Sequence, residues 1–154
     1  AALREYERRA RMGGWGEEVF YSLYRCALLA EQLQHPFGEV VERFLHAYEF
    51  RPARGGEALG QLARFCRGHK RYHSARMYAA QAMAIPLPKD VLFVEPAWYQ
   101  WRCRDEFAVA SFWAGDPESS LRVSEELLAD GTLPESERER VRANAEFARA
   151  KLAR

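Results

Sequence analysis

The chain has 154 residues, and its 23 Lys and Arg against 22 Asp and Glu give a formal net charge of +1. With 48% hydrophobic and 29% charged residues, the composition is typical of one soluble globular domain. The balanced charge argues against a nucleic-acid partner, and no apolar run reaches the roughly 18 residues that a membrane span requires.

The first predicted element begins inside a helical pattern. Residues 1–14 place Ala2 and Tyr6 four positions apart, the spacing of the second helix of a helical repeat, and "RMGG" follows as its exit. We therefore expect 1–14 to be the end of a truncated repeat. The sequence would then be a piece of a longer protein.

Apolar residues at three- and four-residue steps predict two helices within 17–53. The stretch "EEVFYSLYRCALLAEQLQ" (17–34) has this spacing, and "GEVVERFLHAYEF" (38–50) repeats it. The pair His35-Pro36 separates the two helices, and Pro52 follows the second. We expect the two helices to form a first hairpin over 17–53.

The same spacing predicts two more hairpins and a closing helix. The second hairpin covers 55–88 and the third covers 101–132, where Gly115-Asp116 separates its helices. The closing helix, 134–154, is largely polar, as the outer face of a terminal repeat must be. Its thin apolar stripe consists of Val141, Ala145, Ala148 and Leu152.

Small residues recur at a nearly constant distance within each hairpin. The pairs Ala63–Ala75 and Ala108–Ser120 are 12 residues apart, and the pair Ala27–Val40 is 13 apart. Such residues allow two helices to approach closely, and they match the tetratricopeptide pattern, which recurs about every 34 residues. The sequence predicts an all-α fold, a single right-handed α-solenoid of tetratricopeptide-like hairpins with a C-terminal capping helix.

Three longer stretches carry a more specific resemblance: "GGWGEEVFYSLY", "YEFRP" and "IPLPKDVLFVE" with the "YQWRCRDEFAVASFWAG" that follows. With these stretches the chain resembles the tetratricopeptide-like region found beside bacterial family 2 glycosyltransferases. The resemblance covers nearly the whole chain and implies a helical-repeat domain that follows a separate catalytic domain. The chain departs from the pattern at Ala63 and Ala108, where glycine is common. It also departs at Lys70, which stands at the position of the usual turn glycine and implies either a positive φ at this residue or a slightly different turn.

No catalytic or metal-binding pattern accompanies the repeats. A transferase of that family would show an Asp-x-Asp motif, and Asp105-Glu106 has the wrong spacing. His69 and His73 are four residues apart but lack an accompanying carboxylate or thiolate, so a solvated basic turn is the simpler interpretation. Cys26, Cys66 and Cys103 are too widely spaced for a disulfide framework or a zinc site. We expect reduced thiols in the cytoplasm, no metal, no cofactor and no enzymatic activity in this chain.

The first helices of the hairpins are expected to line a concave groove. Three arginines there would make the groove locally basic and suited to an acidic peptide or a phosphate-bearing carrier. The candidate groove residues are Tyr21, Tyr24, Glu31, Arg64, Arg67, Arg102, Asp105 and Phe112.

The stretch 89–100 is an apolar insertion, because Ala63 and Ala108 are 45 residues apart. Its "VLFV" could be a short extended piece, and the prolines at 86, 88 and 96 rule out a continuous helix. Two interpretations are open. Either Leu92 and Phe93 pack against the neighbouring hairpins, or Trp98 or Tyr99 is exposed beside the groove to a peptide, a sugar or the catalytic domain.

These expectations favour a non-catalytic scaffold of a glycosyltransferase-like protein that binds a protein partner or acceptor in its groove. The partner could be an acidic peptide or the protein's own glycosyltransferase domain. A second hypothesis is a homo-oligomerisation module that stacks through residues 1–20. A third is an accessory acceptor site for sugar transfer that uses Trp98, Tyr99 and the arginines.

Overall fold

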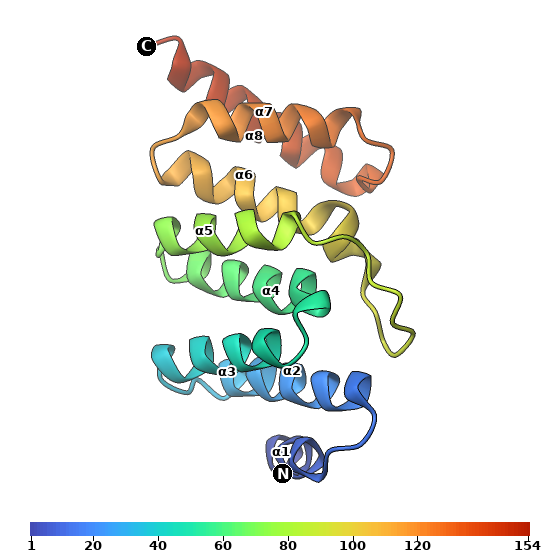
Figure 1. The fold of residues 1–154 in the computed structure, drawn as a ribbon. Helices are drawn as coiled ribbons and strands as arrows, with labels where there is room; N and C mark the ends of the chain where they lie inside the picture. Colours follow the sequence, from blue (N-terminus) through green and yellow to red (C-terminus); the bar gives the residue numbers. More distant parts are fainter.

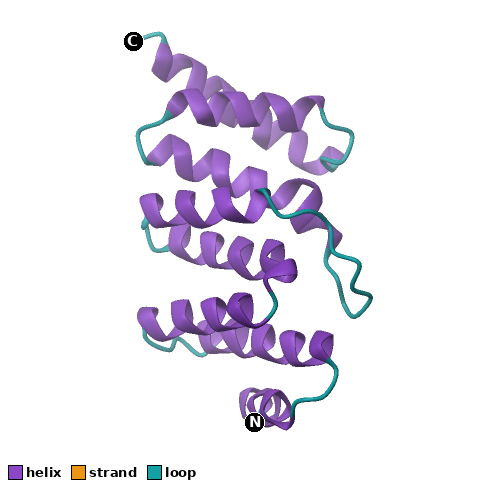
Figure 2. Cartoon of the chain, in the orientation of Figure 1, coloured by secondary structure: helices purple, strands orange, loops and turns teal.

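The structure is a computed structural model that describes all of residues 1–154, and it consists of helices and loops without any strand (Figure 2). The all-α prediction is therefore confirmed. The helices are α1 (Ala2–Met12), α2 (Gly16–Gln32), α3 (Phe37–Phe50), α4 (Gly55–Gly68), α5 (Tyr72–Met83), α6 (Cys103–Trp113), α7 (Pro117–Ala129) and α8 (Glu135–Leu152). A short 3-10 turn, η1 (Pro52–Arg54), precedes α4, and a π-helical turn, η2 (Trp98–Arg102), precedes α6.

The helices are stacked in chain order, with the two termini at opposite ends of the stack (Figure 1). Each helix packs mainly against the helices before and after it in the sequence. Helix α6 also contacts the alternate helices α4 and α8. Because the helices contact only neighbouring or alternate helices, a surface formed by helices on this fold is built from such groups.

Three turns of the stack share one backbone geometry. Each contains a single residue with positive φ: Gln34 at 57°, Lys70 at 58° and Gly115 at 89°. The next residue donates its N–H to the carbonyl five positions back, from 35 to 30 (3.0 Å), from 71 to 66 (2.9 Å) and from 116 to 111 (2.9 Å). This is a Schellman ending, which satisfies carbonyls at the end of a helix. Lys70 has the positive φ that was expected at the turn glycine.

The positions of the small-residue pattern face the core. All six paired residues are buried, so their spacing reflects packing between helices rather than a surface motif. They are Ala27, Val40, Ala63, Ala75, Ala108 and Ser120.

The two ends of the stack are less well packed. Helix α1 contributes no buried residue. Helix α8 buries Val141, Ala145 and Ala148, as the stripe predicts, but Leu152 is 48% exposed. Its inclusion in the stripe was wrong because it lies at the last helical residue, beyond the reach of α7. No helix is both long and apolar enough to span a membrane.

The connection between α5 and α6 differs from the prediction at its C-terminal end. Residues 84–95 are irregular, and "VLFV" forms no strand. The helix begins at Pro96, runs through η2 and continues as α6, so it starts five residues before the predicted boundary at 101. Pro96 begins this helix rather than breaking it, because the first helical position has no intrahelical partner for an N–H.

Candidate functional site

One polar hollow is lined by residues of three alternate helices. It lies across α4, α6 with η2, and α8, and its volume is 410 Å³. We call it the inner hollow. Three of the predicted groove residues, Arg67, Arg102 and Asp105, meet there. The other lining residues are Trp101, Glu106, Val109, Glu137, Arg140 and Asn144.

Two bidentate ion pairs cross the inner hollow from helix to helix. Arg67 of α4 donates to both carboxylate oxygens of Glu106 in α6, at 2.5 and 3.1 Å. Arg140 of α8 donates to both oxygens of Asp105, at 2.8 and 3.1 Å, and also bonds Glu137. The prediction of a locally basic groove was therefore wrong, because carboxylates from the same helix or from an alternate helix neutralise Arg67 and Arg140.

The ion pairs shift the pKa values of the residues that form them. The hydrogen bond that Arg67 donates to Glu106 raises the pKa of Arg67. Burial raises the pKa of Asp105, and the hydrogen bond from Arg140 opposes that shift. The inner hollow thus holds fixed charges of both signs, which bind polar groups with little reorganisation.

Arg102 also lines the inner hollow, but it forms no ion pair with a carboxylate. Its guanidinium lies over the ring of Trp98, 3.9 Å from the ring centroid, which is a cation–π contact. This stacking holds the planar group in place while its N–H donors stay free for a ligand acceptor.

Trp98 and Tyr99 are core residues and not exposed anchors. Trp98 is only 1% exposed, and its ring occupies the space beside Gly60, where a Cβ would come within 2.5 Å of Trp98 Cε3. Tyr99 lies against Gly56 in the same way and donates its hydroxyl to Glu57 at 2.7 Å. The prediction that Trp98 or Tyr99 is exposed beside the groove was wrong. The helix begins at Pro96, and both rings therefore face α4.

The insertion is fixed by a buried ion pair that the sequence analysis missed. Arg54 and Glu57 have fully buried side chains and form two hydrogen bonds, at 2.6 and 2.9 Å. Arg54 also donates to the carbonyl of Leu92, and Glu57 accepts the N–H of Glu95. The three-residue spacing of the pair was visible in "RGGE", but three-residue pairs are usually exposed and so gave no signal of burial.

The side chain of Asp90 is a second anchor of the insertion. Arg51 donates to both of its oxygens, at 2.7 and 2.8 Å. The hydrogen bonds from Arg51 hold the pKa of Asp90 below its usual range. A lowered pKa stabilises the fold above the unfolded value near 3.9, and that contribution is lost as the pH falls through the lower folded value.

We predict that Asp90→Asn lowers the free energy of unfolding at pH 7 by about 1.5–3 kcal/mol, the range for hydrogen bonds to a charged group. The deficit should stay constant from pH 7 to about 4 and shrink below that, because the carboxylate is protonated first in the unfolded chain and then, at its lower pKa, in the folded one. Denaturant unfolding at each pH measures both effects. Glu5→Gln, at an exposed pair with Arg8, is the control and should show neither.

Three other predicted groove residues, Tyr24, Glu31 and Arg64, belong to a chain of hydrogen bonds away from the inner hollow. The Tyr24 hydroxyl donates to Glu95 at 2.7 Å and accepts from Gln61 at 3.1 Å. Arg64 donates to Gln61 at 2.6 Å and to both oxygens of Glu31, at 2.5 and 2.8 Å. Burial raises the pKa of Tyr24, so its hydroxyl stays protonated. These hydrogen bonds connect α2 with α4 and with the insertion.

The remaining predicted residues, Tyr21 and Phe112, lie at opposite ends of the stack. Tyr21 packs against Phe93, with ring centroids 4.8 Å apart, which agrees with the interpretation that packs the insertion onto a hairpin. Phe112 lies edge-on to Trp113 and lines a separate hollow of 130 Å³. Neither residue reaches the inner hollow.

Six residues of the inner hollow were absent from the predicted set: Trp101, Glu106, Val109, Glu137, Arg140 and Asn144. The last three are spaced at i, i+3 and i+7, which places them on one face of α8. The spacing of these polar residues was visible in the sequence, but the closing helix was expected only to cap the repeat, so no ligand-facing side was predicted for it.

The cysteines and histidines form no reactive or metal-binding cluster. The three cysteines are free and buried. Burial raises the pKa of Cys66 to about 11 and that of Cys103 to about 12, so neither is a thiolate at neutral pH. His69 lies 3.0 Å from the carbonyl of Phe65 through Nδ1, and its ring packs on Phe65. No group of three or more His, Cys, Asp or Glu side chains is close enough to hold a metal ion.

Comparison with known proteins adds no relative to this picture. No protein-family model matches the chain, and no curated protein and no solved structure matches it either. The inner hollow is thus characterised by its own residues alone.

Proposed function

We propose that the chain is a non-catalytic interaction domain, a right-handed tetratricopeptide-like α-solenoid that binds a protein partner across α4, α6 and α8. Its three Schellman turns support the repeat: equivalent N–H donors are at 35, 71 and 116, which are 36 and 45 residues apart. The first distance is close to the tetratricopeptide period, and the second exceeds it by the length of the insertion. The resemblance to the repeat region of family 2 glycosyltransferases suggests a parent protein of that kind.

The observation that carries this proposal is the inner hollow itself. Three alternate helices contribute to it, as expected for the groove of a repeat array. Its ion pairs fix the polar groups before a ligand arrives, which lowers the entropic cost of binding. Trp101 and Arg102 are only half-buried and can contact a ligand.

The partner is expected to be a peptide segment that carries one carboxylate. Arg102 offers free donors to it, whereas Asp105, Glu106 and Glu137 would repel a highly acidic segment. A segment with both a carboxylate and neutral hydrogen-bonding groups fits this pattern best. The alternative in which Trp98 and Tyr99 complete a sugar-acceptor site has less support, because both side chains already pack against α4.

Selection of displayed 12-residue peptides on the purified chain tests the proposal. We predict enrichment of peptides with a single carboxylate, whose affinity falls about tenfold in Arg102→Gln, equivalent to about 1.4 kcal/mol. Arg142→Gln is the matched control, since Arg142 is an exposed residue of α8 that does not line the inner hollow. Peptides that bind Arg102→Gln and the original chain equally well would contradict the proposed surface.

A further inference from the structure

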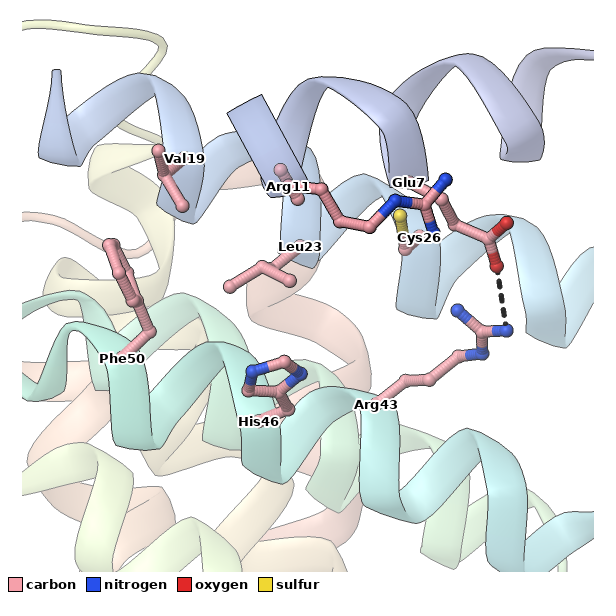
Figure 3. Close-up of a pocket in the computed structure, with 9 residues that line it drawn as sticks. Glu7, Arg11, Val19, Leu23, Cys26, Arg43, His46 and Phe50 are labelled. Carbon is pink, nitrogen blue, oxygen red and sulfur yellow. Dashed lines mark hydrogen bonds and ion pairs between the residues drawn. The ribbon is translucent and has the colours of Figure 1, made fainter. Parts of the chain in front are cut away.

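A second hollow, of 440 Å³, lies between α1 and α3 and has α2 as its floor (Figure 3). We call it the outer hollow. It shares no residue with the inner hollow. Nothing in the sequence analysis pointed to it, because it depends on how far α1 and α3 are separated across α2. Its lining residues are Glu7, Ala10, Arg11, Val19, Leu23, Cys26, Arg43, His46 and Phe50.

The outer hollow is divided into a charged end and an apolar end. Figure 3 shows Arg11, Glu7 and Arg43 together at one end, beside Cys26. At the other end, Val19 of α2 and Phe50 of α3 face the same space, and Leu23 lies between the two ends. A ligand that fits this division has one polar terminus and an apolar body.

Hydrogen-bond donors exceed acceptors at the charged end. Glu7 accepts one bond from Arg43 Nη2 at 3.0 Å, and Glu39, which lies outside the outer hollow, accepts from the same nitrogen at 3.2 Å. Arg43 Nε is buried without any partner. Arg11 is exposed, and no carboxylate is within ion-pair distance of it. Arg11 thus has no carboxylate partner, and Arg43 Nη1 donates no hydrogen bond within the chain, so a ligand carboxylate would supply the missing acceptors.

We propose that the outer hollow binds a small monocarboxylate with an apolar chain, its carboxylate at Arg11 and Arg43 and its chain over Leu23, Val19 and Phe50. Arginine forms charge-assisted hydrogen bonds to carboxylates, and Arg43 Nη1 has no partner within the chain, since the bonds to Glu7 and Glu39 both come from Nη2. Burial of the chain against apolar side chains adds affinity in proportion to the covered area. Binding is non-covalent, because burial raises the pKa of Cys26 to about 11 and the group remains a thiol.

The other classes of ligand fit less well. A cation would meet two guanidinium groups at the polar end, and a neutral chain would leave Arg11 without a counter-charge. A phosphate or dianion would find an opposing carboxylate in Glu7. The inference does not rest on the proposed function, since the two hollows are built from different residues.

Calorimetric titration of the chain with octanoate, kept below its micellar concentration, tests the proposal. We expect saturable binding of one octanoate, binding at least tenfold weaker for 1-octanol and octylammonium, and no measurable binding of acetate. Methyl NMR should show the shifts concentrated at Leu23 and Val19. If octanoate does not bind, or if octanol binds equally well, the proposal is overturned.

Matched variants locate the site. Arg43→Gln and Arg11→Gln should each weaken octanoate binding about tenfold, whereas Arg4→Gln, at an exposed residue of α1 outside the outer hollow, should not change it. Arg11 forms no internal ion pair, so its variant keeps the test valid even if Arg43→Gln loosens α1. Phe50→Ser should weaken binding, whereas Phe147→Ser, also at an exposed phenylalanine, should not. Equal affinities in all the arginine variants would overturn the assignment.

Discussion

Replacement of Glu57 by glutamine is expected to lower the free energy of unfolding by about 3–5 kcal/mol, the range for a buried ion pair that loses one partner. Glu57 is completely buried and accepts hydrogen bonds from Arg54, from the Tyr99 hydroxyl and from the N–H of Glu95. The variant would leave the Arg54 guanidinium buried and without a full counter-charge.

Urea unfolding followed by circular dichroism measures this effect, and Glu146→Gln is the control. Glu146 pairs with Arg149 on the surface of α8, so its loss should cost less than about 0.5 kcal/mol. Hydrogen exchange adds a local readout, because the N–H of Glu95 should lose protection in Glu57→Gln. A loss below about 1 kcal/mol for Glu57→Gln would show that water reaches the pair in solution.

A double-variant cycle separates the buried charge from the other contacts of Glu57. Arg54→Met removes the cation, so Arg54→Met with Glu57→Gln should be destabilised by less than the sum of the two single variants. The expected coupling is about 0.5–3 kcal/mol, as for directly bonded residues. Additive effects would mean that Tyr99 and Glu95, and not Arg54, account for the cost.

The helices of this fold were predictable because their packing is local. Contacts join helices that are neighbours in the sequence, so the spacing of small residues within one hairpin already specifies the buried face. Ala63 and Ala75 are buried as that spacing implies. The prediction failed at Leu152, where the periodic pattern continues beyond the last packed turn of α8.

The candidate site was less predictable because charge pairing depends on alternate helices. Arg67 and Glu106 are 39 residues apart, and Asp105 and Arg140 are 35 apart. Periodicity places each of them on an exposed helix face but says nothing about the opposite charge that faces it. The same limit hid the outer hollow, which depends on Arg11 of α1 and its distance from α3.

Glycine has a packing role in α4 that the alanine pattern alone did not predict. Gly56 and Gly60 are four residues apart, on the face that receives Tyr99 and Trp98. The aromatic residues of the insertion therefore pack onto a helix backbone and not onto side chains. This arrangement explains why a helix carries glycines that each cost about 1 kcal/mol of helix propensity relative to alanine.

Gly60→Ala is accordingly expected to destabilise the chain by about 1–3 kcal/mol, as for an overpacked core, although alanine is the better helix former. The added Cβ would lie 2.5 Å from Trp98 Cε3 and 3.0 Å from Cys103 Sγ, and neither ring nor thiol has room to retreat. Thermal and urea unfolding measure the loss, and Trp fluorescence reports the displacement of Trp98.

Gly68→Ala provides the matched comparison within the same helix. A Cβ at Gly68 would meet nothing within 4 Å, so this variant should be stabilised by about 0.4–1 kcal/mol through backbone entropy and helix propensity. Opposite signs at the two glycines would show that contact with Trp98, and not helix propensity, decides the residue at 60. Stabilisation of both variants would mean that Trp98 moves away at little cost, and the insertion would then be a loosely attached segment.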